Sequence, residues 1–201
     1  MRFLALGNSY TVGTGVPPEG RWPEQLARRV CQSGLPPAEV RLVAQNGWTT
    51  DELMRGIQVA RLSPTFDLVS LQIGVNNQFR GYALQTYQHE FRRLLETANA
   101  LAGGKSNHVL VLSIPDWSVT PFAAGRDRTQ IALEIDRFNA INRSEAENGG
   151  TQYVDVTPLT RKKGGQAAFL APDGLHPSGK MYAAWVQLLL PTVMAVLNSE
   201  N

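Results

Sequence analysis

The chain has 201 residues, and its 19 Lys and Arg residues nearly balance its 17 Asp and Glu residues, which leaves a formal charge of +2. This charge is far below that of proteins that bind nucleic acid through its phosphates, so nucleic acid is not expected as a partner. The length is sufficient for a substantial hydrophobic core and does not require a second domain. We therefore predict one domain over residues 1–201.

The sequence shows no sign of export or membrane insertion. It starts with strand-like residues instead of a signal-peptide core, and no apolar run approaches the length needed to cross a bilayer. The single cysteine, Cys31, lies near Leu26 and Val30 in an amphipathic stretch, which indicates a buried structural thiol. We expect a soluble, cytoplasmic protein without stable membrane insertion, and the sequence leaves its oligomeric state open.

Strand-like runs alternate with helix-like runs along the chain, which is typical of a parallel sheet covered by helices on both faces. The predicted strands are Arg2–Leu6, Glu39–Ala44, Leu68–Ile73, His108–Ile114 and Gln152–Val156. The predicted helices, with apolar residues three and four positions apart, are Pro23–Ser33, Thr50–Leu62, Leu84–Leu101, Arg128–Glu147 and Lys180–Leu197. Residues 157–179 show little periodicity and are expected to form a long functional loop, in which Arg161-Lys162-Lys163 is solvated.

Five strands with intervening helices fit an α/β doubly wound sheet of strand order 2-1-3-4-5. In such a sheet the ligand crevice lies beyond the carboxyl ends of the strands, where the strand order reverses. The loops that follow the first three strands are then spatial neighbours. These loops contain Ser9, Gly47 and Gly74-Val75-Asn76-Asn77, so we expect these residues to meet in one crevice.

The segment Gly7-Asn8-Ser9-Tyr10-Thr11 places a hydroxyl directly after the first predicted strand. An aliphatic alcohol is a poor nucleophile near neutral pH, so it needs a base to take its proton and a third group to orient that base. His176 is the best candidate base, because Asp173 precedes it by three residues in the long loop. His89 and His108 fall in a predicted helix and at the start of a strand, where solvated or structural roles are ordinary. The pattern indicates a nucleophilic site.

A tetrahedral intermediate at Ser9 also needs hydrogen-bond donors for its oxyanion. The main-chain N–H of Ser9 is available if Ser9 opens a helix or a tight turn. Gly47 can offer its N–H at close range because it has no Cβ, and the side-chain amide of Asn76 can add a further donor. We expect these groups to form an oxyanion hole.

The order and spacing of these motifs resemble the SGNH (GDSL-type) hydrolases. The resemblance covers nearly the whole chain and rests on Gly7-Asn8-Ser9, Gly47, Gly74-Val75-Asn76-Asn77 and Asp173-Gly174-Leu175-His176. It implies a three-layer flavodoxin-like fold and hydrolysis of esters or thioesters, with no metal and no other cofactor. It also implies that Ser9 is the nucleophile of a triad with His176 and Asp173. Gly47 and Asn76 would then be oxyanion donors beside the Ser9 N–H.

Two positions depart from the pattern that is usual in this family. Asn8 stands where the family commonly has the Asp of Gly-Asp-Ser, and Asn77 stands where it has the Asp of Gly-x-Asn-Asp. Asn keeps a carbonyl acceptor and a similar shape, but it loses a charge and gains a donor. Because the proposed triad and donors are intact, we expect activity on a small-molecule ester. Such substrates include small or medium acyl esters, thioesters and O-acetyl groups on sugars.

Several residues near the motifs are weaker candidates for contact with the substrate. Three aromatic residues in the loops after the second and fourth strands could wall the pocket or serve loop packing: Trp48, Trp117 and Phe122. Tyr10 and Arg80 are further candidates because they lie near motif residues. Asp116, at the end of a predicted strand, is expected to cap a turn more than to bind substrate.

Two functions of other classes remain open from the sequence. Ser9-Tyr10-Thr11 together with Gly13-Thr14-Gly15 is compatible with the phosphate cradle of a flavodoxin-like flavin-binding or phosphate-binding module. That interpretation leaves Asp173 and His176 unexplained. An inactive relative that binds carbohydrate is the second alternative, and it is motivated by Asn8 and Asn77.

Overall fold

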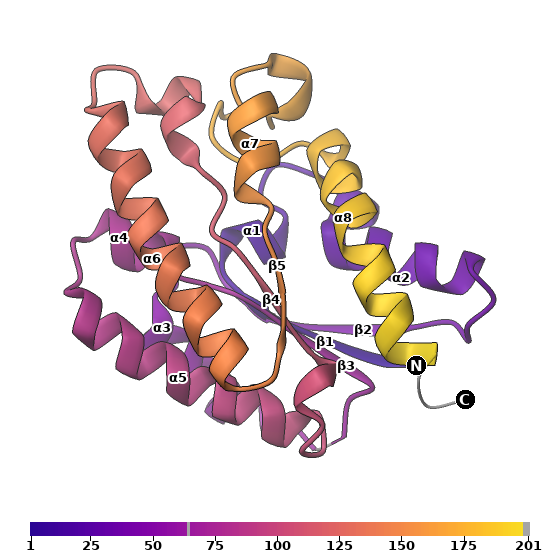
Figure 1. Cartoon of the computed structure of the whole chain (residues 1–201). Helices are drawn as coiled ribbons and strands as arrows, with labels where there is room; N and C mark the ends of the chain where they lie inside the picture. The colour runs from indigo at the N-terminus through magenta and orange to yellow at the C-terminus, as the bar shows by residue number, and fades with distance from the viewer. Residues whose placement is uncertain (64, 199–201) are drawn as a thin grey trace.

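Five parallel strands form a sheet at the centre of the molecule in the order β2-β1-β3-β4-β5, as the sequence predicts (Figure 1). This computed structural model describes residues 1–63 and 65–198. The strands are β1 (Arg2–Gly7), β2 (Glu39–Ala44), β3 (Leu68–Gln72), β4 (Val109–Leu112) and β5 (Gln152–Val154). The inner strand β3 is buried along its whole length, whereas the edge strand β2 is mostly exposed or half-buried.

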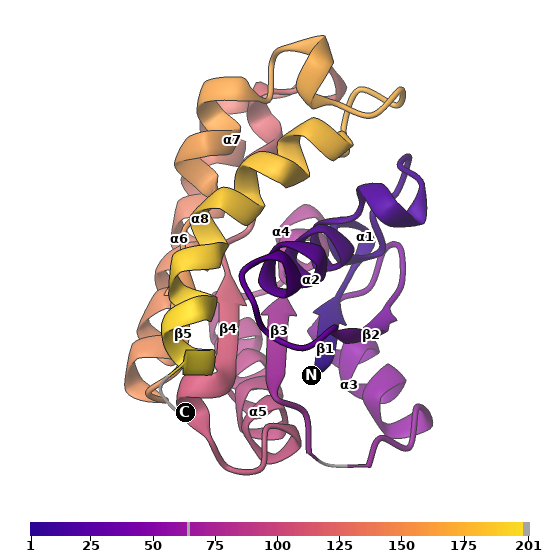
Figure 2. The same cartoon turned by 90° about the vertical axis from the view of Figure 1, so that its right-hand side faces the viewer.

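Helices cover both faces of the sheet, which confirms the predicted three-layer α/β architecture (Figure 2). α2 and α8 pack against each other on one face, and α3, α5 and α6 cover the other. The helices are α1 (Ser9–Val12), α2 (Trp22–Gln32), α3 (Thr50–Val59), α4 (Val75–Phe79), α5 (Leu84–Leu101), α6 (Arg128–Asn148), α7 (Thr157–Lys163) and α8 (Gly179–Asn198). The long predicted helices are therefore present, with ends shifted by up to three residues.

The segment 157–179, predicted as a loop, begins with the helix α7. Its basic cluster is not a solvated loop either, because it forms the last turn of this helix. Arg161 pairs there with Asp116 at 2.7 Å and with Asp136 at 2.8 Å. The cluster therefore begins with a structural arginine that joins α7 to the loop after β4 and to α6.

Cys31 is exposed, so the predicted buried thiol is wrong. Leu26 and Val30, four positions apart, do face the core from α2. Cys31 lies about 100° further around the helix than Val30, which turns its side chain away from the buried stripe. Closeness in sequence to two core residues misled the prediction.

The helix α8 corrects the expectation that no apolar segment approaches the length needed to cross a bilayer. The helix has 20 residues, and an 18-residue window within it has a mean hydropathy of 1.4, so it reaches the length and composition of a membrane-spanning segment. Its apolar side chains also serve the fold, because Tyr182, Trp185 and Leu189 are buried and the helix packs along α2. Burial of one side of this helix against the sheet and α2 accounts for part of its apolar composition, whereas Leu188 is 43% exposed.

Candidate active site

Ser9 begins the short helix α1 directly beyond the end of β1 and is 7% exposed. Asn8 caps this helix, since its Oδ1 accepts a hydrogen bond from the Tyr10 N–H at 3.1 Å. This capping bond needs only an acceptor oxygen, which an amide supplies as a carboxylate would. The N–H of Ser9, in the first turn of a helix, has no partner within the helix and is available to a ligand.

The loop before α8 holds His176 against Asp173. The imidazole Nδ1 lies 2.6 Å from Asp173 Oδ2, and Asp173 Oδ1 accepts the backbone N–H groups of Leu175 and His176, both at 2.9 Å. Burial by itself raises the pKa of the Asp173 carboxyl, but the hydrogen bonds from His176 and from these two backbone groups outweigh it. The pKa of Asp173 therefore lies below its ordinary value, and the group is an anion at neutral pH.

Backbone hydrogen bonds close this loop on itself. Ala171 N–H donates to His176 O at 2.7 Å, and Ser178 N–H donates to Phe169 O at 3.0 Å. Leu170 and Pro177 form an antiparallel bridge between these two bonds. The Asp173–His176 pair therefore lies in a short loop whose two ends are fastened together by the main chain.

Gly47 lies in the turn after β2 with φ of 82°, a left-handed conformation that favours glycine. Arg80 Nη2 donates to its carbonyl at 2.7 Å, and Arg80 also pairs with Glu52 of α3. Nearby, Thr14 Oγ1 donates to Asn46 Oδ1 at 2.7 Å, which joins this turn to the segment after α1. Thr14, which belongs to the segment of the alternative phosphate-binding interpretation, thus connects two loops of the site.

Asn76 is the second residue of α4, and Asn77 follows it. Asn76 Nδ2 donates one hydrogen to Trp48 O at 2.9 Å, which leaves the second hydrogen of the amide for another acceptor. Asn77 is fully buried and makes two bonds to the start of α3: Oδ1 accepts from Thr50 N–H, and Nδ2 donates to Thr50 Oγ1 at 2.7 Å. Asn77 therefore has a structural role in joining the loops after β2 and β3.

The loops after β1, β2 and β3 and the loop before α8 converge on one cavity of about 210 Å³. Its polar lining includes four of the predicted residues: Ser9, Gly47, Asn76 and His176. Asp173 lies behind His176. The crevice is therefore at the carboxyl edge of the sheet, where the strand order reverses, as the topology predicts.

One wall of this cavity is aromatic and consists of Phe79, Trp117 and Phe122, which we call the aromatic wall. The Trp117 ring packs edge-on against the other two, with centroid distances of 5.7 Å to Phe79 and 5.9 Å to Phe122. Trp48, in contrast, does not line the cavity. Its indole lies against Gly56 of α3, so the structure does not support the predicted substrate contact of Trp48.

Hydrogen bonds fix the position of Trp117. Its Nε1–H donates to Gln78 Oε1 at 2.9 Å, and Gln78 Nε2 donates to Glu134 of α6 at 2.7 Å. The preceding residue, Asp116, is fully buried and caps the turn through Ser118 N–H, in agreement with its expected role. Trp117 is therefore held both through its ring nitrogen and through the backbone of its turn.

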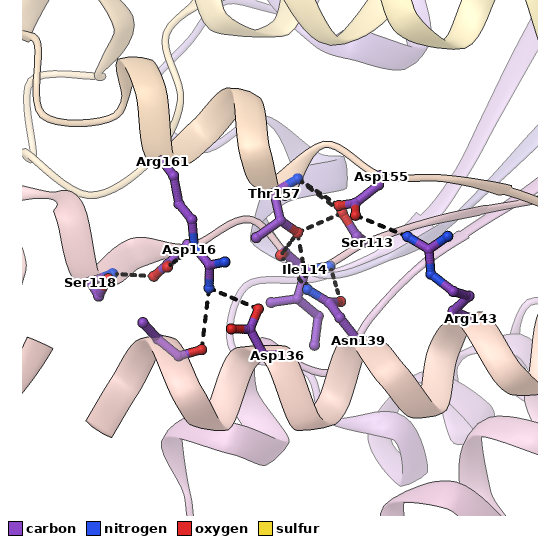
Figure 3. A network of polar contacts seen from close by, with 11 residues as sticks. Ser113, Ile114, Asp116, Ser118, Asp136, Asn139, Arg143, Asp155, Thr157 and Arg161 are labelled. Atoms are coloured by element: carbon purple, nitrogen blue, oxygen red, sulfur yellow. Dashed lines mark hydrogen bonds and ion pairs between the residues drawn. The ribbon is translucent and has the colours of Figure 1, made fainter. Parts of the chain in front are cut away.

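Asp116 belongs to a polar network that joins the ends of β4 and β5 to α6 and α7 (Figure 3). Arg161 reaches from α7 to Asp116 and Asp136, as described above. At the other end of this network, Thr157 Oγ1 contacts Ser113 Oγ at 2.8 Å, and Asn139 makes two bonds to the backbone of Ile114. The network supports the loop that carries Trp117.

Tyr10 lines the cavity next to His176, with the two ring centroids 5.7 Å apart. Burial, followed by the negative charges of Asp116 and Asp173, raises the pKa of the Tyr10 phenol, which stays neutral near physiological pH. The other histidines lie elsewhere: His89 is exposed on α5, and the Nδ1 of the buried His108 is 2.7 Å from Asp67 O. Within residues 1–63 and 65–198, no group of three or more His, Cys, Asp or Glu side chains could hold a metal ion.

Sequence reasoning missed two apolar residues of the lining, Phe79 and Leu175. Phe79 follows Val75 by four positions, and both residues line the cavity from α4. Spacing of four residues on a helix gives this shared face, but a helix of five residues is too short to show a period in the sequence. Leu175 lies inside a predicted motif, between Asp173 and His176, and its position alone was the available signal.

Solved structures with the same fold include proteins described as esterases and lipases. TesA matches with a TM-score of 0.75 and 20% identity over 98% of this chain and 99% of its own. The esterase EstA from Pseudoalteromonas sp. has a TM-score of 0.75, 15% identity and coverage of 98% for both chains. Axe2, an acetylxylan esterase from Geobacillus stearothermophilus, has a TM-score of 0.68, 20% identity and coverage of 98% and 93%. These similarities show the fold.

No curated protein matches the sequence significantly. The sequence pattern of the GDSL-like lipase/acylhydrolase family, however, matches residues 5–184, which include every motif of the site. This match confirms the resemblance drawn from the sequence. The chain therefore belongs to the GDSL-like lipase/acylhydrolase family and is a carboxylic ester hydrolase.

Proposed function

We propose that the chain hydrolyses small-molecule esters through a Ser-His-Asp triad formed by Ser9, His176 and Asp173, with an acyl-enzyme intermediate on Ser9. The observation that carries this proposal is the cavity itself. Ser9 and His176 line it together, and the Asp173 carboxylate lies 2.6 Å from the imidazole Nδ1, which leaves Nε2 for the Ser9 hydroxyl. This is the order of nucleophile, base and orienting acid that the chemistry requires.

In the first half of the reaction, Ser9 Oγ attacks the carbonyl carbon of the ester while His176 Nε2 takes the hydroxyl proton. Asp173 accepts the hydrogen bond of His176 Nδ1–H, which fixes the tautomer and stabilises the imidazolium. The carbonyl oxygen becomes an oxyanion. The N–H groups of Ser9 and Gly47 and the Asn76 amide supply its donors, each worth about 2.7–4 kcal/mol in comparable sites, although such losses do not add simply.

The intermediate collapses by breaking the bond to the alcohol or thiol, which leaves with the proton held by His176. The acyl group remains on Ser9 Oγ. In the second half, His176 takes a proton from water, the hydroxide attacks the acyl carbon, and the Ser9 Oγ bond breaks as His176 returns the proton. The products are the carboxylic acid and the free enzyme.

The size of the cavity favours small or medium acyl groups. Its volume of about 210 Å³ lies below the range of roughly 300–1,000 Å³ of pockets that enclose drug-sized ligands. Its apolar wall suits a short acyl chain or an aryl group, and the carbonyl oxygen would face the donors. We therefore propose short aliphatic esters, thioesters and O-acetyl groups as substrates. The O-acetyl groups are in keeping with the description of Axe2 as an acetylxylan esterase.

Covalent labelling tests this proposal directly. The protein is incubated with a fluorophosphonate, digested and analysed by mass spectrometry, and we expect the adduct on Ser9. Ser118, a buried serine in the Trp117 turn, serves as the matched internal control. An adduct on another residue, or none on a folded sample, contradicts the proposed nucleophile.

A series of aryl esters of increasing acyl length tests the proposed substrate range. We expect kcat/KM to peak at short or medium chains and to fall once the acyl group exceeds the cavity. Ser9→Ala and His176→Ala should each remove nearly all turnover. Circular dichroism of both variants must match the wild type, because the proposed roles are chemical.

A further inference from the structure

Arg126 lies against the aromatic wall of the cavity. Its guanidinium carbon is 5.4 Å from the centroid of Phe79, 5.7 Å from that of Trp117 and 5.2 Å from that of Phe122. Phe79 and Phe122 are 50% and 40% exposed, whereas Trp117 is buried. Arg126 is exposed and is not one of the residues that line the cavity, so its guanidinium lies over the solvent-accessible part of the aromatic wall.

Arg126 also lacks a carboxylate partner in the part of the chain that the structure describes. Other arginines near the site have such partners: Arg80 pairs with Glu52, and Arg161 pairs with two aspartates. Contact with ring faces uses the positive charge of Arg126 but leaves its N–H donors without a protein acceptor among the described residues. A guanidinium with free donors is suited to bind a carboxylate through two parallel hydrogen bonds.

The cavity offers no competing negative charge. None of its lining residues is acidic, and Asp173, the carboxylate of the proposed triad, is hydrogen-bonded to His176. The aromatic surface under Arg126 also displaces water from one side of the guanidinium, which strengthens its attraction for an anion. Of the three rings under Arg126, that of Trp117 is held in place by its hydrogen bond to Gln78.

We propose that Arg126 is a specificity-determining residue, and that the preferred substrates are esters that carry a carboxylate in addition to the ester group. This inference rests on the proposed function, since it concerns the substrate of the same site. The ester carbonyl faces the oxyanion donors while the carboxylate contacts Arg126 across the aromatic wall. Half-esters of dicarboxylic acids and acyl esters of hydroxy acids share this chemistry.

Matched pairs of esters test the inference. The 4-nitrophenyl half-ester of glutaric acid is compared with 4-nitrophenyl pentanoate for a charge on the acyl side. The acetate of 4-hydroxybenzoate is compared with the acetate of 4-hydroxybenzamide for a charge on the alcohol side. For each pair, the measured quantity is kcat/KM of the charged ester divided by kcat/KM of the neutral ester. For at least one pair, we expect this ratio to be at least about fivefold lower in Arg126→Gln than in the wild type, because a hydrogen bond to a charged group is lost.

Two variants serve as controls. Arg126→Lys keeps the charge without the paired donors, so its ratio should lie between those of the wild type and Arg126→Gln. Arg29→Gln removes the same charge from an exposed position on α2 and should leave the ratio unchanged. If Arg126→Gln has the same ratios as the wild type for both pairs and still hydrolyses neutral esters through Ser9, the role of Arg126 is overturned. The proposed hydrolysis is unaffected by that outcome.

A binding measurement separates this inference from the proposed hydrolysis. In Ser9→Ala, which cannot form the acyl-enzyme, calorimetry compares 4-phenylbutyrate with 4-phenylbutyramide. We expect the carboxylate to bind at least about fivefold more tightly, and this preference to vanish when Arg126→Gln is added. Equal binding of the two probes to Ser9→Ala overturns the inference even if no ester is hydrolysed.

Discussion

At the scale of single residues, Asn77 shows how an amide is accommodated where relatives commonly carry an acid. Its Nδ2 donates to Thr50 Oγ1, and the Thr50 hydroxyl in turn donates to Glu90 Oε2. The carboxylate at the end of this chain of hydrogen bonds is thus supplied by α5 instead of by position 77. Each donor has one acceptor, and the loops after β2 and β3 are joined without a charge at their contact.

Asn77→Asp should therefore be destabilising. Two carboxylates would compete for the single Thr50 hydroxyl proton, and the loss of a buried hydrogen bond to a charged group costs about 1–3 kcal/mol. Adding Glu90→Gln supplies an N–H donor to Thr50 Oγ1 and releases the hydroxyl for position 77. Urea denaturation should show the double variant to be more stable than Asn77→Asp. Additive losses in the two variants would contradict this account.

Asp173→Asn should lower kcat by up to about 10⁴-fold. The amide can present N–H to the imidazole Nδ1, which places the imidazole proton on Nε2, where it cannot accept the Ser9 proton. Because the pKa of Asp173 is lowered, the wild-type carboxylate stays ionised even at pH values near the ordinary aspartate pKa of about 3.9. Its own protonation should therefore remove activity only at more acidic pH. Steady-state kinetics of both proteins from pH 4 to 9 measure this. Equal kcat would rule out the orienting role.

The polar residues of the site were predictable because motif and topology agree on them. Each of these residues follows or precedes a predicted element at the sheet edge where the strand order reverses. Together they line one cavity: Ser9, Gly47, Asn76 and His176. Trp48 was not predictable, because the side to which its ring turns depends on the backbone of a tight turn. Nothing in the local sequence distinguishes it from Trp117 or Phe122.

At the scale of secondary-structure elements, the contact between α5 and α6 depends on Glu145. This side chain is nearly buried and accepts two hydrogen bonds from Arg92, at 2.8 and 2.9 Å, and one from Gln88 at 2.6 Å. The hydrogen bonds from Arg92 are the main cause that lowers the pKa of Glu145, against the opposing effect of burial. Two long helices on the same face of the sheet are thereby joined by a charged pair.

Glu145→Gln should reduce stability in a pH-dependent way. The folded-state pKa is lowered, so the contribution of the pair is complete above the unfolded value of about 4.3 and is lost as the pH falls through the folded value. We expect a loss of about 1–2 kcal/mol at pH 7, since Arg92 is largely exposed and screened. In urea denaturation at pH 7, 5, 4 and 3, the difference in the free energy of unfolding between Glu145→Gln and the wild type should disappear as the pH falls. Glu147→Gln, on the exposed side of α6, is the control; an equal loss there would contradict the pair's role.

The long helices were predictable from their apolar spacing, whereas α7 was not. Leu159 is the single large apolar side chain between Thr157 and Lys163, so the segment has no period to detect. Its real signals are local. Pro158 stands in the first turn and Gly164 directly after the end, which are the preferred places of these residues in a helix. These two residues were available in the sequence and were read as part of a loop.

At the scale of the whole molecule, burial falls from the centre of the sheet to its edges. β3 and β4 are buried at every residue, whereas every residue of β5 is half-buried and most of β2 is exposed or half-buried. The strand order was predictable because strands and helices alternate along the chain. The depth of each strand followed from its composition, since the inner strands are continuous apolar runs interrupted by few polar residues.

Hydrogen exchange should follow this gradient. We expect the amides of β3 and β4 to exchange slowest, through global unfolding, and those of β2 to exchange faster through local opening. Exchange measured by mass spectrometry on peptides that cover 39–44 and 68–72 gives the comparison. Equal protection of the two strands would show that the edge does not open separately.

In the closed loop before α8, the position of the Asp173–His176 pair and the shape of the cavity depend on different groups. Main-chain hydrogen bonds fasten the ends of this loop, and backbone N–H groups hold Asp173, so the pair with His176 depends little on the side chain between them. That side chain, Leu175, faces the cavity. Directed evolution at this one position should therefore reshape substrate preference while the reactive groups stay in place, which makes Leu175 the first site to randomise for a new selectivity.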